Sequence, residues 1–235
     1  MLPQGPLNRL MRMRRFFAPA LIFALAPLGA VAQTSLPPNQ LTNFRDTSSF
    51  KPPAGAKVAV IEYEDLQCPA CAHAFPMVHA AVSHYHIPIE ENDFQIPGHP
   101  WSHDGAIFAH YLKAKVSPEI AEQFRREVFA SQFRIASKDD LRNFEESFMK
   151  ARGKQMPFVI DPTGQYDREV NATTAQGERI GVAHTPTILV VTQNHWIQVE
   201  DPQEMYAAID QAQAEAGRST PTASNAHRVS PGVHK

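Results

Sequence analysis

Along the middle of the chain, hydrophobic residues first follow the pattern of a buried strand and then the period of a helix. Residues 57–64, KVAVIEYE, form a compact apolar run rich in β-branched side chains, which is typical of a buried central strand. The period then changes, and Phe75, Val78 and Val82 recur at the spacing of one helix face. A second short strand is predicted within residues 87–96.

The region from about 100 to 182 has helix-start signals but no strand pattern. Ser117 comes directly before Pro118, which is typical of an N-cap followed by proline in the first helical turn. Ser137 with Asp140 three residues later resembles a capping box. These signals predict a block of helices.

The strand pattern returns near the end of the folded part. Residues 187–191 and 196–200 predict a hairpin with a polar turn, and an amphipathic helix follows over about 202–216. A further helix is predicted over 165–180. The order of strand, helix, strand, helical block, hairpin and helix predicts an α/β domain.

The two ends of the chain lack the pattern of a packed domain. Residues 1–32 combine a basic head, a short apolar run and small final residues, which predicts a secretory signal cleaved after Ala32. A retained membrane anchor is the alternative. Residues 33–56 predict an irregular segment and residues 217–235 a disordered tail, which leaves one folded domain over 57–216.

Charge narrows the range of partners. The chain has 22 basic and 24 acidic residues, and the predicted signal holds four arginines and no acid. Export would therefore leave 18 basic against 24 acidic side chains and a formal charge of −6. Such a surface repels phosphate backbones, and residues 33–235 have no basic cluster, so nucleic acid is not expected as a partner.

Both cysteines lie in the stretch DLQCPACAHAFP, at Cys68 and Cys71. A bridge over so short a loop restricts the unfolded chain little, so a purely structural disulfide is poorly motivated. The predicted turn from strand to helix places Cys68 at a helix N-terminus, where free N–H groups lower a thiol pKa. Cys71, one turn further, is expected to be less exposed. This arrangement suits a nucleophilic and a resolving thiol, and Pro69 is well tolerated between them.

A strand that leads into C-P-x-C at a helix start, with a later T-P before a strand, resembles the thioredoxin fold. With its helical block and its predicted export, the chain resembles the DsbA family of thiol:disulfide oxidoreductases. The resemblance covers roughly Lys57 to Gly217. It implies a central mixed sheet flanked by helices, with a helical insertion between the second strand and the cis-proline loop. It also implies periplasmic catalysis by Cys68 and Cys71 without any cofactor.

The resemblance implies a substrate-binding surface around the cysteines. Pro186 matches the family's cis-proline, and Thr185 before it would pair with the main chain of an extended substrate. Pro69 and Ala70, between the cysteines, belong to the same predicted surface. A trans proline that starts an edge strand is the alternative at Pro186.

Glu62 is the predicted proton carrier. Alternation places it on the strand face of Val58 and Val60, where the thioredoxin fold has a buried acid beneath the disulfide. Burial would raise its pKa and allow it to relay a proton to or from Cys71. The alternative is a solvated glutamate at the strand end, beside Glu64 and Asp65.

Two departures from the family pattern leave the direction of electron flow open. Ala70 stands where the DsbA pattern has histidine, and without an imidazolium Cys68 should be less acidic and its disulfide less oxidising. Thr185 stands before the predicted cis-proline, where the DsbA pattern has valine. A disulfide donor is the main prediction, and a reductase or isomerase, or a redox-inert peptide-binding chaperone, are the alternatives.

Expected partners are exported substrate proteins and a membrane protein of the DsbB type that reoxidises the cysteines. The segment 33–56 is too short for the dimerisation domain of the family's isomerases, which predicts a monomer.

Histidines raise the possibility of a metal site instead. No second C-x-x-C motif exists, and Ala72 after Cys71 rules out the haem attachment pattern C-x-x-C-H. We therefore expect no metal. The ligands that such a site could use are Cys68, Cys71, His73, His99, His103 and His110. His99 and Trp101, in PGHPWSH, either border the substrate groove or cap and pack a helix.

Overall fold

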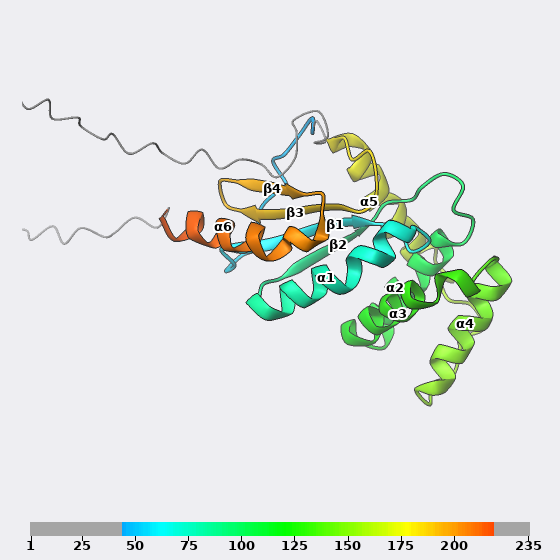
Figure 1. The fold of residues 1–235 in the computed structure, drawn as a ribbon. Helices are drawn as coiled ribbons and strands as arrows, with labels where there is room; N and C mark the ends of the chain where they lie inside the picture. Colours follow the sequence, from blue (N-terminus) through cyan, green and yellow to red (C-terminus); the bar gives the residue numbers. More distant parts are fainter. Residues whose placement is uncertain (1–43, 219–235) are drawn as a thin grey trace, which may run out of the picture. The chain divides into compact units, whose positions relative to one another are not determined.

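A computed structural model describes residues 44–218 (Figure 1). The predicted signal with its cleavage site after Ala32, residues 33–43 and the chain after Arg218 lie outside the described residues. Residues 44–57 contain turns but neither helix nor strand. Within 44–218, no helix has both the length and the apolar character needed to cross a membrane.

Four strands form a mixed sheet in the order β2–β1–β3–β4. The central strand β1 (Val58–Glu64) pairs in parallel with β2 (Ile89–Asp93) and antiparallel with β3 (Thr187–Thr192). The edge strand β4 (Trp196–Val199) is antiparallel to β3. Every residue of β1 and β3 is buried, which explains the nearly continuous apolar runs of these two strands.

Helices occupy the positions that the local signals predict. Ser117 accepts a hydrogen bond from the backbone of Ile120, and Ser137 forms the predicted capping box with Asp140. The last helix continues to Arg218, two residues beyond the predicted end at 216. The helices are α1 (Pro69–Tyr85), α2 (Ser102–Lys115), α3 (Pro118–Ser131), α4 (Lys138–Ala151), α5 (Gln165–Ile180) and α6 (Met205–Arg218), with short 3₁₀ turns η1 (Gln132–Arg134) and η2 (Pro202–Glu204).

Helices cover both faces of the sheet (Figure 1). Val60 and Val190 belong to the face that packs against α1 and α6. Tyr63 belongs to the other face, which packs against the end of α5. Helix α5 approaches the sheet closely, because a Cβ added at Gly177 would lie 2.6 Å from the ring of Phe94.

The inserted helices have a core that includes the cysteines. Cys68, Cys71 and Phe75 at the start of α1 pack in one cluster with residues of α2, α3 and α4, among them Phe108 and Phe124. The insertion is therefore joined to the sheet domain at the cysteine pair. This architecture agrees with the predicted thioredoxin fold with a helical insertion.

Candidate active site

Cys68 lies at the turn from sheet to helix. Strand β1 ends at Glu64 and α1 begins at Pro69, so Cys68 is the N-cap residue of α1. Both cysteines are free thiols. Cys68 is 8% exposed and Cys71 is 0% exposed, so Cys68 is the thiol that solvent and substrates reach first.

The surroundings of Cys68 stabilise its thiolate. They lower the thiol pKa from 9.0 to about 5, chiefly through a hydrogen bond with the side chain of Cys71. A hydrogen bond with the side chain of Thr185 and the backbone N–H groups of Cys71 and Ala70 add to this, while partial burial opposes it. Ala70 thus contributes through its backbone, and Cys68 is acidic without an imidazole beside it.

Cys71 has the opposite environment. Burial raises the pKa of its thiol, and the hydrogen bond to Cys68 and the negative charges of Cys68 and Glu64 raise it further. Cys71 therefore keeps its proton at neutral pH. A proton must reach or leave its sulfur whenever a disulfide of this residue is broken or made.

The loop before β3 lies against the nucleophilic sulfur. The peptide bond between Thr185 and Pro186 is cis. Cys68 Sγ donates a hydrogen bond of 3.5 Å to the carbonyl oxygen of Thr185. The antiparallel pairing of Thr187 with Tyr63 places this loop beside the end of β1, and so brings together residues 117 positions apart.

Gln132 holds the cysteine loop from the side of the insertion. Its Nε2 donates to the carbonyl oxygens of Leu66 at 2.8 Å and Cys68 at 3.0 Å. The next residue, Phe133, is 85% exposed. An apolar ring therefore stands in solvent one residue from the contact with the cysteine loop.

Asp65 connects the same loop to the segment after β2 and to the start of α2. It is 1% exposed and accepts hydrogen bonds from the backbone of Ile96 and the hydroxyl of Ser102. His99 Nδ1 lies 3.0 Å from its Oδ1. Trp101 is 1% exposed and belongs to the core, so the packing interpretation holds for this residue.

Glu62 is buried within β1. It is 0% exposed, and burial raises its pKa well above the ordinary value, with the charges of Glu64 and Glu91 adding to the rise. Neither of its carboxylate oxygens has a hydrogen-bond partner among the described residues. The interpretation of a solvated strand-end residue does not fit Glu62, nor its neighbours Glu64 and Asp65, which are 0% and 1% exposed.

Three of the histidines named for a metal site, His99, His103 and His110, have acidic partners. His103 lies 2.8 Å from Asp167, and His110 lies between Asp93 and Glu169 at 2.8 and 2.9 Å. Within residues 44–218, no group of three or more histidine, cysteine or acidic side chains is arranged to hold a metal ion.

Comparison with known proteins supports the same family. A search of curated proteins finds no match. The sequence model of the family Thioredoxin_4, described as Thioredoxin, matches residues 53–211. The chain belongs to this family.

Solved structures that resemble this Thioredoxin_4 protein include a DsbA protein, a thioredoxin-like protein and ScsC. The thiol-disulfide exchange protein alpha-DsbA2 from Wolbachia pipientis has a TM-score of 0.56 at 14% identity, over 68% of this chain and 84% of that one. A periplasmic thioredoxin-like protein from Salmonella enterica serovar Typhimurium has a TM-score of 0.54 at 16% identity, over 73% and 93%. ScsC from Proteus mirabilis has a TM-score of 0.51 at 14% identity, over 70% and 71%. The predicted DsbA-like thioredoxin fold is therefore confirmed.

The Thioredoxin_4 protein brings most of the predicted site residues together. Cys68 contacts Cys71 and Thr185, and Pro69 and Ala70 are exposed on the first turn of α1. Sequence reasoning missed Gln132 and the buried ion pair of Glu64 with Arg125, in which Arg125 Nη1 lies 2.5 Å from Glu64 Oε1. Glu64 lies two residues after Glu62 and therefore on the same strand face, which was the available signal for its burial. No local pattern indicated Gln132 or Arg125.

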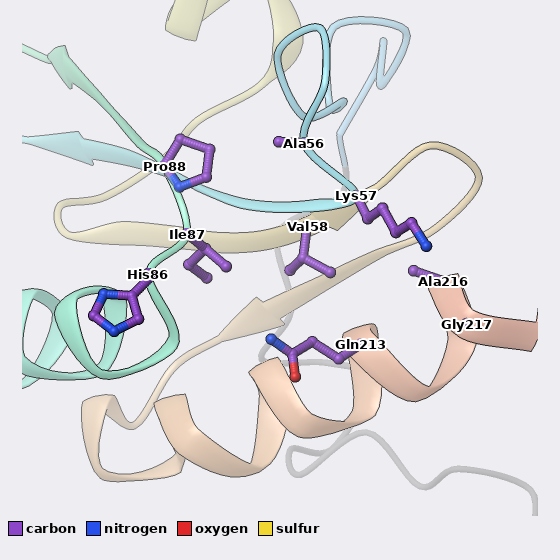
Figure 2. A pocket seen from close by; sticks show the side chains of 9 residues that line it. All are labelled: Ala56, Lys57, Val58, His86, Ile87, Pro88, Gln213, Ala216 and Gly217. Atoms are coloured by element: carbon purple, nitrogen blue, oxygen red, sulfur yellow. The ribbon is translucent and has the colours of Figure 1, made fainter.

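A cavity of about 330 Å³ lies at the other end of β1 (Figure 2). Val58 and Ile87 line it, together with Lys57 and with Gln213 of α6. Since β1 runs from this cavity toward the cysteines, the cavity is separate from the candidate active site of the Thioredoxin_4 protein.

Proposed function

We propose that this protein exchanges disulfides with exported proteins and works as a disulfide donor. The observation that carries the proposal is the contrast between the two thiols. Cys68 has a pKa lowered to about 5 beside Thr185, and Cys71 behind it has a raised pKa. A stabilised Cys68 thiolate favours the reduced form, which makes the disulfide oxidising.

The reaction needs only the two thiols and a proton. A substrate thiolate attacks Cys68 Sγ, the bond between Cys68 and Cys71 breaks, and its electron pair leaves on Cys71. The Cys71 sulfur then takes up a proton, for which the buried Glu62 is the sequence-predicted carrier. A second substrate thiolate attacks the substrate sulfur of the mixed disulfide and releases Cys68 as a thiolate.

Substrates bind across the cysteines in this proposal. The Thr185 backbone before cis-Pro186 pairs with an extended substrate segment, and Pro69 and Ala70 form the opposite wall. The 3.5 Å contact between Cys68 Sγ and the Thr185 carbonyl supports this proposal, because a substrate sulfur must approach Cys68.

The cellular setting belongs to the same proposal. The chain is exported to the periplasm with cleavage after Ala32, acts as a monomer, and is reoxidised by a membrane protein of the DsbB type. The resemblance to a periplasmic thioredoxin-like protein supports the location. Reduced exported proteins are the substrates.

Unfolding of the two redox forms tests the direction of exchange. We expect the reduced protein to melt at a higher temperature than the oxidised protein. A disulfide that is readily donated is one whose reduction stabilises the folded protein. Differential scanning calorimetry in the presence and absence of a reductant measures this. A more stable oxidised form contradicts the donor assignment and indicates a reductase.

Trapping tests the exchange itself. The Cys71→Ser variant should accumulate a mixed disulfide between Cys68 and glutathione, detected by mass spectrometry, and Cys68→Ser should not. A cysteine pair that stays inert toward glutathione would favour the redox-inert peptide binder.

A further inference from the structure

A cavity of about 220 Å³ lies within the helical insertion, between α2, α4 and the loop that follows α4. Ile107 of α2, Leu141 of α4 and Ile160 of the loop give it an apolar lining. No residue of the cysteine loop or of the loop around Pro186 lines it. The cavity is therefore separate from the candidate active site.

Glu145 places a buried carboxyl group in the wall of this cavity. The residue is 3% exposed, and it is one of the residues that line the cavity. Among residues 44–218, its carboxyl group has neither a hydrogen bond nor a salt bridge. A buried polar group without a partner costs free energy, because it has lost its contacts with water and gained none within the protein. This carboxyl group is thus available to a hydrogen-bond donor that enters the cavity.

The two basic side chains at the cavity are paired with other acids. Lys138 Nζ lies 2.8 Å from Asp104 Oδ2, and Arg142 Nε lies 3.1 Å from Glu146 Oε1. Both bases line the cavity, and neither forms a salt bridge with Glu145. The cavity therefore has one carboxyl group more than its own bases neutralise.

The electrostatic environment of Glu145 disfavours a bare negative charge. Burial raises the pKa of Glu145 to about 8, the charges of Asp104 and Glu146 add to the rise, and Arg142 opposes it. The charged neighbours of Glu145 are these three side chains and Lys138. A cation bound in the cavity would stabilise the carboxylate and displace its proton.

The lining selects among cations. Within the described part of the chain, no group of three or more histidine, cysteine or acidic side chains is arranged to hold a metal ion, so a metal ion does not fit this cavity. An organic ammonium ion needs fewer ligands, since its N–H groups donate to a carboxylate in a charge-assisted hydrogen bond. The apolar lining matches a hydrocarbon chain attached to that ammonium.

We propose that this cavity binds an alkylammonium group, with its hydrocarbon chain against the apolar lining and its charge at Glu145. The group comes from a small free amine or from a lysine side chain of another protein. Phe158 and Val159 directly precede Ile160 and are 99% and 52% exposed, so they are placed to contact the residues on either side of such a lysine. The proposal does not depend on the function proposed above.

Two probes of equal length test the site. n-Pentylammonium and 1-pentanol are titrated separately at pH 8.5, where an alkylammonium with an ordinary pKa of about 10.4 keeps its proton. The methyl NMR signals of Ile107, Leu141 and Ile160 report on the cavity. We expect n-pentylammonium to shift them with a Kd of about 1 mM, and 1-pentanol to bind about tenfold more weakly. Equal affinities, or no binding of either probe, would overturn the proposal.

Glu145→Gln tests the carboxyl group itself. This variant should weaken the binding of n-pentylammonium about tenfold and leave that of 1-pentanol unchanged, because the amide has a similar size but no charge. Glu178→Gln is the control, since it removes the same charge from an exposed position of α5 outside the cavity. It should bind both probes as the wild type does. An equal loss in both variants would indicate a general effect of charge and contradict the proposal, and the comparison of the two probes in the wild type stands even if Glu145→Gln does not fold.

The pH dependence of binding gives a test that needs no variant. At pH 6 the affinity for n-pentylammonium should be about tenfold lower than at pH 8.5, because the ion must displace the proton of Glu145. An affinity that stays the same or rises at pH 6 would show that Glu145 is not the partner of the ammonium, and would overturn the proposal.

A peptide distinguishes the two sources of the ammonium group. If the ligand is a lysine side chain, N-acetyl-Leu-Lys-Leu-amide should bind about fivefold more tightly than n-pentylammonium, and Phe158→Ser should remove this gain. Equal affinities of the peptide and n-pentylammonium would identify a small free amine as the ligand.

Discussion

Single residues around the cysteines set the reactivity of the site. Cys68 and Cys71 differ because one sulfur receives hydrogen bonds while the other is enclosed by the core and faces negative charge. The environment, rather than the C-x-x-C spacing itself, therefore assigns the two roles. Ala70 leaves this difference intact because its backbone N–H, not its side chain, reaches the sulfur.

The acidity of Cys68 can be measured by alkylation. We expect iodoacetamide to modify Cys68 of the reduced protein with a midpoint at about pH 5. Cys71→Ala removes the largest stabilising hydrogen bond and Thr185→Val a smaller one, so both midpoints should rise, that of Cys71→Ala more. A wild-type midpoint near that of free cysteine would contradict this explanation.

Phe133 offers a test of substrate contact. Its ring is 85% exposed and follows Gln132, which bonds to the Cys68 carbonyl. We expect Phe133→Ser to slow the oxidation of an unfolded protein about fivefold, the value of about 1 kcal/mol of apolar contact, and to leave the rate with glutathione unchanged. Tyr206→Ser is the control, because Tyr206 is also exposed but contacts Tyr85 at the far end of α1. Equal effects of both variants would argue against a local contact.

At the scale of elements, the contact between α5 and the sheet depends on a missing side chain. Gly177 faces Phe94 and Tyr63 so closely that a Cβ would lie 2.6 and 3.3 Å from their rings. The helix can pack at this depth only because the residue has no side chain.

We expect Gly177→Ala to lower the stability of the protein by about 2 kcal/mol through overpacking. This corresponds to a fall in melting temperature of about 4–8 °C. Gly217→Ala is the control, since no atom lies within 4 Å of a Cβ at that position of α6. It should leave the melting temperature unchanged or raise it slightly. A Gly177→Ala variant as stable as the control would show that the ring of Phe94 moves aside freely.

Elements with local signals were predictable, and contacts between distant elements were not. Ser117 and Ser137 indicate where their helices begin, because a capping hydrogen bond joins residues only three positions apart. The pair of Glu64 and Arg125 spans 61 residues and depends on how α3 crosses the sheet. Alternation placed Glu62 on the correct face, and the same reasoning applied to Glu64 would have predicted its burial.

At the scale of the whole molecule, the pKa of Cys68 couples folding to pH. Its folded pKa of about 5 lies below the ordinary value of 9.0. The thiolate therefore stabilises the folded reduced protein fully above pH 9, and this contribution is lost as pH falls through 5. The oxidised protein has no such thiol.

We expect the stability advantage of the reduced form to shrink as the solution is acidified. Between pH 7.5 and pH 5 the loss should be about 1–2 kcal/mol, after an allowance for solvent screening of a half-buried sulfur. Urea unfolding of both redox forms at several pH values measures this. An advantage that does not change with pH would show that the thiolate is not stabilised by folding.

The guanidinium of Arg125 makes the sheet and the insertion mutually dependent. Without α3, Glu64 and Asp93 would lose the guanidinium that pairs with both of them. We therefore expect a minimal thioredoxin made by deleting the helical block to be less stable unless these acids are replaced as well. The insertion is not an exchangeable module, and protein engineers who wish to transplant the cysteine loop must transplant the salt-bridge layer beneath it.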